Sequence, residues 1–367
     1  MKFVCETDLI QKNISYLQGV IMGKSSAPIS ALLIESTGTD SITLSSTDLT
    51  IGMKIKIPAE VEKGGKFVVP SKKFSDIIRK LPPRDKVTAE SSEENNKMTL
   101  KVSKSIVCHM LGYNINEVPD IPVLKKDNRF EMPQKLLKDM MLKTSYAIAK
   151  DEIRYALNGA FIEEDKGKIS MVATDGHRLS FIEKQADSKG IGLGIIIPSK
   201  TISELVKLLG EEGNVACYIS DTNIFFEFEN ILLVSRLLDG KFPNYKQIIP
   251  RKFEGIFTVD KAVFTQAIDR VSVFAYEKNG GMLFNVKKDV IEVIARSPEF
   301  GDAQEIVELA SSDFDGMEIS FNFQYLMDVF RIIDSATIEF NVINSSSPVL
   351  IKGEDADQIN IVMPMRL

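Results

Sequence analysis

The fold of this chain is decided by a phrase that occurs twice, VVPSKKFSDII at residues 68–78 and IIPSKTISELV at residues 196–206. Each copy reads as a short apolar strand, a serine suited to the N-cap, and then an amphipathic helix. A weaker third copy, ISFNFQYLMDV, occupies residues 319–329. Copies separated by the length of a domain indicate an internal repeat.

A second phrase has nearly the same period. A short strand with a phenylalanine, a polar turn and a helix recurs at Phe3, Phe130 and Phe257, each 127 residues after the last. Between the helices, ALLIE at 31–35 resembles GAFIE at 159–163. Unrelated domains with similar helix caps are the alternative, but two phrases that share one period favour a true repeat.

The repeat predicts three α+β domains, with boundaries at residues 1–125, 126–252 and 253–367. Each should have two helices and about eight strands. Many short strands for each helix indicate continuous antiparallel sheets on one side and helices on the other. The helices are expected at residues 7–22, 71–80, 133–150, 199–209, 260–278 and 321–333.

The composition, 44% hydrophobic and 26% charged, is that of a soluble globular protein. The sequence has no apolar run of about 18 residues, so no membrane span is expected. Three scattered cysteines, Cys5, Cys108 and Cys217, suit free and mostly buried thiols in a reducing cytoplasm. With only two histidines, a histidine-rich metal site is excluded.

The net charge of −6 argues against a nucleic-acid partner when taken alone. The expected helices, however, carry a net positive charge, mainly at residues 71–80 and 133–150. If all helices line one surface, that surface would hold phosphates without reading bases, and an acidic exterior would repel DNA. The alternative is that the lysines only solvate helix faces. The helices of the third domain add little positive charge to this surface.

Two segments resemble enzyme motifs. GVIMGKS at residues 19–25 has three residues between its glycines where a P-loop needs four, and its start is helical. We therefore interpret it as a helix end and a basic loop with Lys24 at its tip. In TDGHRL, residues 174–179, Asp175 and His177 could form an acid–base pair, support a turn, or belong to a binding surface. The turn is favoured because Asp48 has the same place in the first repeat.

The C-terminus has two methionines, Met363 and Met365, beside Pro364. Such flexible apolar side chains suit an adaptable peptide groove. A frayed tail is the alternative.

Four segments carry a family resemblance: RYALNG at 154–159, ATDGHRL at 173–179, DGKFPNY at 239–245 and VMPMRL at 362–367. They resemble motifs of the bacterial sliding clamp, the beta subunit of DNA polymerase III. The resemblance covers the whole chain, including the threefold repeat. It implies DNA-clamp domains in a head-to-tail homodimeric ring, with helices lining the inside and antiparallel sheets on the outside.

The resemblance also implies a processivity factor of the cytoplasm without a catalytic site, cofactor or metal. Its partners would be duplex DNA, bound without sequence preference, the DNA polymerase III alpha subunit, the clamp loader and other proteins with clamp-binding motifs. Two other hypotheses stay open at this point: an enzyme that uses Asp175 and His177, and a monomeric scaffold of three repeats.

The resemblance assigns candidate residues to three sites. The peptide-binding pocket would comprise Leu157, Thr174, Gly176, His177, Arg178, Leu179, Pro243, Gln247, Ile248, Pro348, Ile361, Val362, Met363, Pro364, Met365 and Arg366. Gln247 stands where the family commonly has arginine. The DNA contacts would be Lys24, Lys72, Lys73, Lys150, Arg154, Tyr155 and Lys200. The dimer interface would place Val273 and Phe274 against Cys108 and Met110 of the other chain.

Overall fold

The computed structural model describes residues 1–21, 31–92, 96–126, 128–188, 194–275, 280–313 and 316–366. The chain divides into two compact units. The first contains residues 1–136 and 203–237 and a short segment that begins at Asp187. The second contains residues 137–186, the chain from Leu238 onward, and a segment that ends at Ile202. No helix in these described ranges is long and apolar enough to cross a membrane.

Each of the three repeats contributes two α-helices and nine strands among the described residues, one strand more than expected. The first repeat consists of β1 (Lys2–Glu6), α1 (Thr7–Ile21), β2 (Ala31–Thr37), β3 (Ser41–Thr47), β4 (Ile51–Pro58), β5 (Glu60–Lys63), β6 (Lys66–Pro70), α2 (Ser71–Arg79), β7 (Lys86–Ser92), β8 (Lys97–Val102) and β9 (Ile106–Leu111). The second consists of β10 (Arg129–Pro133), α3 (Gln134–Ser145), β11 (Gly159–Asp165), β12 (Lys168–Thr174), β13 (Arg178–Gln185), β14 (Asp187–Ser188), β15 (Gly194–Pro198), α4 (Ser199–Leu208), β16 (Asn214–Ile219), β17 (Asn223–Phe228) and β18 (Ile231–Arg236). The third consists of β19 (Gly255–Asp260), α5 (Lys261–Ser272), β20 (Gly281–Val286), β21 (Val290–Ser297), β22 (Gly301–Glu308), β23 (Ser311–Ser312), β24 (Met317–Asn322), α6 (Phe323–Ile332), β25 (Thr337–Val342), β26 (Val349–Lys352) and β27 (Gln358–Val362).

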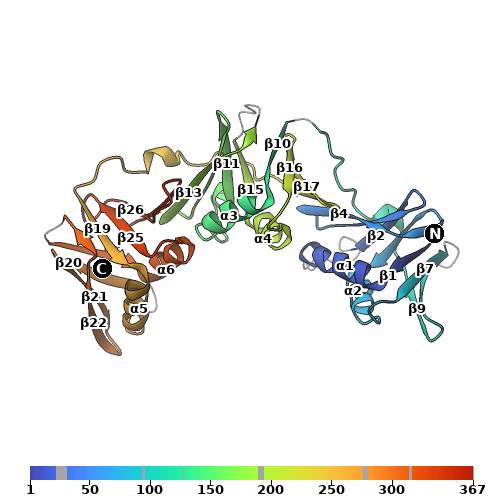
Figure 1. The fold of residues 1–367 in the computed structure, drawn as a ribbon, viewed down its shortest axis with the longest axis horizontal. Coiled ribbons are helices and arrows are strands. Elements are labelled where there is room, and N and C mark those ends of the chain that lie inside the picture. Colours follow the sequence, from blue (N-terminus) through green and yellow to red (C-terminus); the bar gives the residue numbers. More distant parts are fainter. Residues whose placement is uncertain are drawn as a thin grey trace. The chain divides into compact units, whose positions relative to one another are not determined.

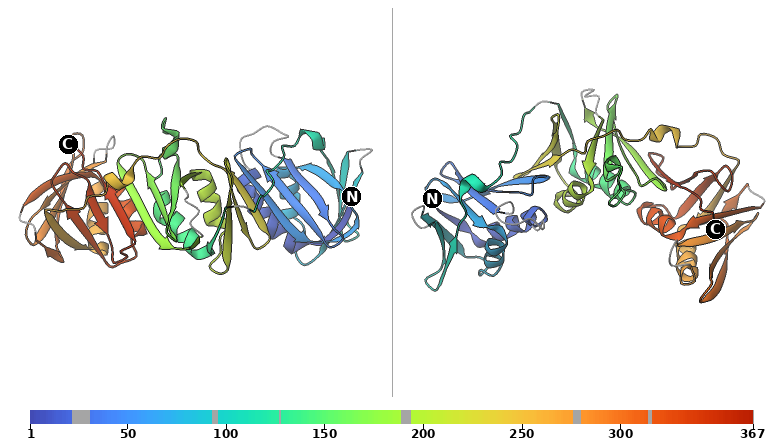
Figure 2. Two further views of the ribbon diagram at one scale, coloured as in Figure 1. Left: turned by 90° about the horizontal axis from the view of Figure 1, so that it is seen from above. Right: turned by 180° about the vertical axis from the view of Figure 1, so that it is seen from behind.

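The first unit has two sheets. One has the order β5-β1-β7-β8-β9, and the other has the order β14-β10-β16-β17-β18-β4-β3-β2-β6. The second sheet passes from one repeat to the next where β18 pairs antiparallel with β4, with Leu233 opposite Met53. Helices α1 and α2 lie side by side against β3, β4 and β6 (Figures 1 and 2).

The second unit is built in the same way. Its larger sheet has the order β15-β11-β12-β13-β27-β26-β25-β19-β23, and the smaller one β22-β21-β20-β24. Here the repeats join where β13 pairs antiparallel with β27, with Ser180 opposite Asn360. Helices α5 and α6 contact each other and the strands of both sheets (Figure 1). The expected α+β class with continuous antiparallel sheets is therefore confirmed.

The repeating phenylalanine is a core residue in every copy. Phe3, Phe130 and Phe257 are 0%, 1% and 3% exposed. In the third repeat, Phe257 stacks on Phe340 with ring centroids 4.7 Å apart. Phe264 of α5 meets the edge of Phe340 at 5.9 Å. Such buried ring pairs add to the stabilisation from apolar burial, and they hold the helix against the sheet.

Two helices end five or six residues before the expected position. Helix α3 was expected to extend to residue 150 but ends at Ser145. After it, the amides of Ala147 and Ile148 bond to carbonyl oxygens three residues back, which tightens the chain into a turn. Lys150 therefore lies in a loop. Helix α5 was expected to reach residue 278 but ends at Ser272 in a similar turn.

The serine cap predicted for α2 is wrong. Ser71 and Ser199 are the first residues inside α2 and α4. Pro70 occupies the N-cap of α2 and its side chain makes no capping bond. In the third repeat, Asn322 does cap its helix, because its Oδ1 accepts a hydrogen bond from Gln324 N at 2.9 Å.

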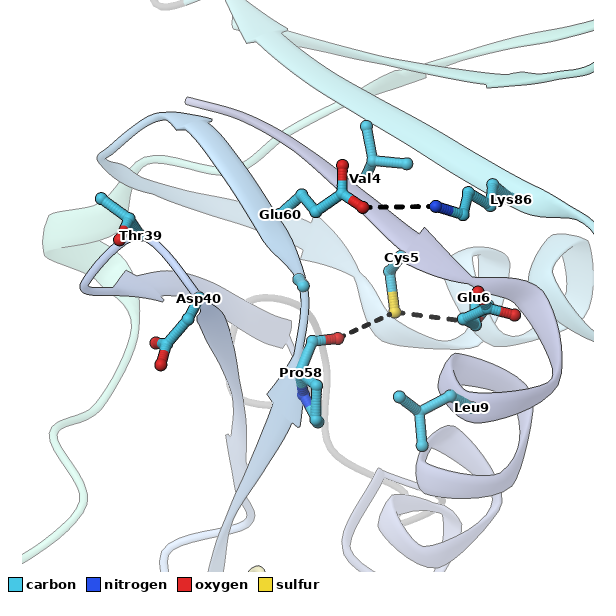
Figure 3. Close-up of a pocket in the computed structure, with 10 residues that line it drawn as sticks. Val4, Cys5, Glu6, Leu9, Thr39, Asp40, Pro58, Glu60 and Lys86 are labelled. Carbon is cyan, nitrogen blue, oxygen red and sulfur yellow. Dashed lines mark hydrogen bonds and ion pairs between the residues drawn. The ribbon is translucent and has the colours of Figure 1, made fainter.

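The three cysteines are free thiols, as expected, and two of them are buried. Figure 3 shows Cys5 beside a hollow of about 380 Å³ between β1, β4 and α1. Its Sγ lies 3.5 Å from the carbonyl oxygens of Glu6 and Pro58. Burial raises the pKa of the Cys5 thiol to about 11, so this thiol stays protonated at neutral pH.

Candidate peptide site and interaction surfaces

A tight turn joins β12 to β13 in the second unit. Thr174 Oγ1 donates to Arg178 O at 2.6 Å and accepts from Gly176 N at 3.1 Å. Asp175 Oδ1 accepts from the amides of His177 and Arg178 at 2.9 and 3.0 Å. Gly176 adopts a φ of 90°, which glycine tolerates best. The turn holds the His177 ring at the surface.

The first repeat contains the same turn between β3 and β4. Thr47 Oγ1 donates to Ile51 O at 2.9 Å, and Asp48 Oδ1 accepts from the amides of Thr50 and Ile51 at 2.9 and 2.8 Å. Leu49 has a φ of 75° where the second repeat has glycine. This repetition supports the interpretation of Asp175 as a turn residue rather than a catalytic base.

Arg178 is held between two rings and two carboxylates. Its guanidinium carbon lies 5.2 Å from the ring centroid of Tyr146 and 4.6 Å from that of Tyr325. Its Nε is 3.0 Å from Asp175 Oδ2, and its Nη1 is 2.6 Å from Asp328 Oδ2. Burial lowers the pKa of Arg178, but the bonds and charges of Asp328 and Asp175 outweigh it and raise the pKa. The pairing therefore ties the turn to α6.

A second polar group lies where β13 pairs with β27. Tyr146 OH donates to Asn360 Oδ1 at 2.9 Å, and Ser180 Oγ lies 3.1 Å from the same oxygen. Burial raises the pKa of Tyr146, so its phenol remains a donor. Ser180 Oγ also donates to Lys143 O at 2.8 Å, and Asn360 Nδ2 donates to Ile351 O at 3.3 Å. Because these buried groups all have hydrogen-bond partners, the junction between repeats is specific as well as buried.

The C-terminal segment is fixed by backbone bonds. Met363 N donates to His177 O at 2.8 Å, and Met365 N donates to Ser320 O at 2.7 Å. The segment therefore continues from β27 across the turn and β24. These bonds argue against the frayed tail over the described residues up to Arg366.

The predicted pocket residues, all in the second unit, differ in burial. Leu157, Leu179, Ile361 and Val362 are at most 1% exposed and belong to the hydrophobic core. Thr174 is also buried, at 5% exposed, whereas the half-buried or exposed positions are Gly176, His177, Arg178, Pro243, Gln247, Ile248, Pro348, Met363, Pro364, Met365 and Arg366. Tyr146, Tyr325, Asp328 and Asn360 were not predicted for this site.

Comparison with known proteins agrees with this geometry. Residues 1–122, 131–244 and 246–366 match the N-terminal, central and C-terminal domains of the DNA polymerase III beta subunit. A beta sliding clamp of Caulobacter vibrioides is 32% identical, with both chains covered completely. The chain belongs to the beta sliding clamp family. Another relative, the beta sliding clamp of Halalkalibacterium halodurans, is 30% identical over the full length of both chains.

Solved clamps of this family have the same fold. The crystal structure of the Pseudomonas aeruginosa beta subunit superimposes with a TM-score of 0.96 at 28% identity, over 100% of both chains. The Bacillus subtilis sliding clamp gives a TM-score of 0.95 at 26% identity, over 100% of this chain and 99% of the other. As a beta sliding clamp, the chain is a non-catalytic processivity factor of DNA polymerase III. The enzyme hypothesis is therefore wrong.

The residues that the clamp resemblance assigned to DNA contact lie in both units. Lys72 and Lys73 are exposed on α2 of the first unit. In the second unit, Lys150, Arg154 and Tyr155 are exposed, whereas Lys200 is half-buried. Arg154 Nε pairs with Glu152 Oε1 at 3.1 Å. Lys24 lies outside the described residues.

The residues assigned to the dimer interface lie beside the edge strands of two sheets. Cys108 and Met110 are half-buried on β9, the edge of the five-stranded sheet. Val273 is 76% exposed just after α5. A Cβ placed on Gly301, at the start of the edge strand β22, would lie 4.0 Å from the Phe274 ring. Both predicted halves of the interface therefore lie on or beside an edge strand.

No group of three or more His, Cys, Asp or Glu side chains within the described ranges is arranged to hold a metal ion.

Proposed function

We propose that two copies of this chain close head to tail into a ring around duplex DNA. The helices of three repeats, bounded at residues 125 and 252, would face the DNA, and the sheets would form the outside. The DNA polymerase III alpha subunit, the clamp loader and other proteins with clamp-binding motifs would dock short peptides at the turn and the C-terminal segment. A bacterial clamp acting on chromosomal DNA would work in the cytoplasm.

The observation that supports ring closure is the repeated strand pairing. Phe130 and Phe257 hold equivalent positions in their repeats. Following the paired residues from strand to strand across the sheet leads from Phe130 to Leu233 of β18 and from Phe257 to Asn360 of β27. Leu233 pairs with Met53 of β4, and Asn360 with Ser180 of β13. Each junction between consecutive repeats therefore uses equivalent strands in one register.

In the first repeat, the equivalent row of paired residues leads from Phe3 to Cys108 of β9. Among the described residues, no further strand lies beside β9. On the other side, Ala303 of β22 is equivalent to Met53 and Ser180. The repeat therefore predicts that β9 pairs antiparallel with β22 of a second copy, with Cys108 opposite Ala303 of the partner subunit.

Exposed apolar side chains on the two edges suit this register. Leu111 at the end of β9 is 71% exposed, and Phe300 just before β22 is 69% exposed. Counting three residues along each strand from the pair of Cys108 and Ala303 places them opposite each other. Val107 and Ile306, 51% and 59% exposed, fall on the same face. Uncovered apolar residues along an unpaired edge are typical of an interface.

Binding of phosphates by exposed lysines would hold DNA without reading its sequence. Lys72 and Lys73 are adjacent and exposed, and the first turn of α2 contains no acidic residue. Topological linkage would then retain the clamp while these contacts exchange. The tethered polymerase would gain effective concentration at the template.

The docking of peptides is supported by the half-buried methionines of the C-terminal segment and by the rigid turn beside them. One solved clamp, that of Pseudomonas aeruginosa, was crystallised bound to griselimycin, which shows that the surface of a clamp accepts a ligand. In this chain the Arg178 network would keep the turn and the segment in one arrangement. A preorganised site loses less conformational entropy on binding.

Deleting residues 363–367 tests the peptide site. The shortened chain should still form dimers and remain on circular DNA after loading, yet lose stimulation of primer extension. Linearising the circle is the control, because a ring slides off free ends. Full stimulation by the shortened chain would refute the peptide site, and equal retention on circular and linear DNA would refute encirclement.

A further inference from the structure

A hollow on the sheet of the first repeat has a filled counterpart in the second. In the first repeat, Leu33 of β2 lies opposite Ser45 of β3, and Ser45 lies opposite Lys54 of β4. In the second repeat, Phe161, Val172 and Phe181 form the equivalent row. A one-turn 3-10 helix crosses near each row, Ile115–Glu117 in one repeat and Tyr245–Gln247 in the other.

Aromatic rings occupy this place in the second repeat. Phe161 stacks on Phe242 with centroids 5.1 Å apart, and Tyr245 lies 5.8 Å from Phe181. Tyr245 is only 4% exposed. Its hydroxyl donates to Glu163 Oε2 at 2.8 Å, and Lys246 pairs with the same oxygen at 2.8 Å. The remaining hollow here is about 270 Å³.

The first repeat has Leu33 and Lys54 in place of Phe161 and Phe181, and it has no counterpart of Phe242 because its connection is shorter. Both connections start from the same bond to the sheet, from Tyr113 N to Val68 O and from Leu238 N to Ile196 O, each 3.0 Å. The 3-10 helix begins two residues after Tyr113 but seven residues after Leu238. The extra residues of the second connection include Phe242, and Ile115 stands where the other repeat has its tyrosine.

The first repeat therefore has a larger hollow of about 550 Å³, and its described lining contains no aromatic residue. Leu33 and Ile115 line it, and Ile115 is 43% exposed. Glu35 keeps the place of Glu163 and pairs with Lys66 at 2.7 Å, as Glu163 pairs with its lysine. The Glu35 carboxylate therefore has its lysine partner and can also accept a hydrogen bond from a phenol, as Glu163 does from Tyr245.

Charge adds a second requirement for an occupant. Lys54 stands where the second repeat has Phe181, is half-buried, and has no ion pair among the described residues. A second hollow of about 650 Å³ also includes Thr43 and Lys54 in its lining. The two hollows therefore share part of their lining along β3 and β4.

We infer that this hollow is a second binding site of the clamp, which takes a tyrosine or phenylalanine side chain of an extended peptide segment from a partner protein, with a carboxylate of that peptide beside Lys54. The ring would occupy the place that Tyr245 fills in the second repeat. A tyrosine would add a hydrogen bond to Glu35. The site is separate from the turn at residues 174–178 and the C-terminal segment.

Methyl-detected NMR of the full-length chain tests the site with a blocked dipeptide, N-acetyl-Tyr-Asp-amide. The methyl signals of Leu33, Ile115 and Val118 should shift, with a dissociation constant on the order of a millimolar for so small a probe. N-acetyl-Ala-Asp-amide should bind about 10-fold more weakly, because it lacks the ring that would be buried. Equal shifts with the alanine probe, or shifts only near residues 174–178, would overturn the inference.

Two variants and a control locate the binding. The double variant Leu33→Phe with Ile115→Tyr should fill the hollow as the second repeat does and abolish the shifts. Ile153→Tyr, which adds a ring at an isoleucine that is 89% exposed elsewhere, should change nothing. Lys54→Gln should weaken the aspartate probe about 2- to 5-fold but leave N-acetyl-Tyr-Asn-amide unaffected. Binding that persists in the filled variant would refute the site.

The filled variant leaves the C-terminal segment untouched. It should therefore stimulate primer extension as the original chain does, so failure of this inference is distinguishable from failure of the proposed clamp function.

Discussion

Replacing Ala303 by cysteine should close the ring covalently through the natural Cys108. The register derived from the repeat places these two residues opposite each other in neighbouring subunits. Facing residues of antiparallel strands have Cα atoms about 4.5 or 5.5 Å apart. Disulfides span Cα separations of about 4.4–6.8 Å, so either kind of facing pair is within reach.

The geometry also predicts which neighbours fail. Successive residues rise about 3.4 Å along a strand and point to opposite faces. A cysteine at Gln304 would therefore point away from Cys108. A cysteine at Glu305 would return to the same face but lie about 8–9 Å away, which exceeds the reach of a disulfide.

Mild oxidation followed by a non-reducing denaturing gel measures the result. The Ala303→Cys chain, 40.9 kDa before the change, should migrate as a dimer, and reduction should reverse it. Adding Cys108→Ser should abolish the dimer band. A stronger band from Gln304→Cys or Glu305→Cys would refute the register, and no band in any variant, with a monomer in sedimentation, would refute strand pairing altogether.

Three further outcomes are expected. Arg178→Ala should reduce the free energy of unfolding in urea by about 1.5–3 kcal/mol, because Asp175 and Asp328 each lose a charged hydrogen-bond partner in a partly buried network while Arg331 still pairs with Asp328; a loss below about 0.5 kcal/mol would contradict the network. Reversing Lys72 and Lys73 to glutamate should lower the slope of log affinity for DNA against log salt by about two, whereas an unchanged slope would exclude α2 from phosphate contact. At pH 8, a thiol with a pKa of about 11 is only about 0.1% thiolate, so iodoacetamide should modify Cys5 far more slowly in the folded chain than in the chain unfolded in urea, as followed by mass-spectrometric mapping; equal rates would be inconsistent with its burial.

Local patterns in the sequence predicted most of the fold. The strand and helix phrases depend on neighbours a few residues apart, so Phe3, Phe130 and Phe257 could be matched and the six helices located. The turn at Asp175 was predictable for the same reason, because Asp48 repeats it. The ends of α3 and α5 were missed, since the tightening after Ser145 and Ser272 depends on backbone bonds that helical periodicity does not reveal.

The interior of the candidate peptide site could not be predicted from such patterns. Arg178 and Asp328 are 150 residues apart, and their pairing depends on how β13 meets β27 and where that brings α6. The family motifs pointed to Arg178 but not to its two tyrosines. The length difference between the connections after Tyr113 and Leu238 is visible in the sequence. Its effect on the sheet surface is not, because that effect depends on how each connection packs against the strands.

The shared ladder of β4 and β18 limits how this chain can be taken apart. A fragment that stops at residue 125 would keep every strand of the first repeat, yet its β4 would lose the neighbour that covers its backbone groups. A bare edge containing Met53 and Ile55 invites association with any available strand. Modules of this protein expressed singly should therefore precipitate or pair with the wrong copy.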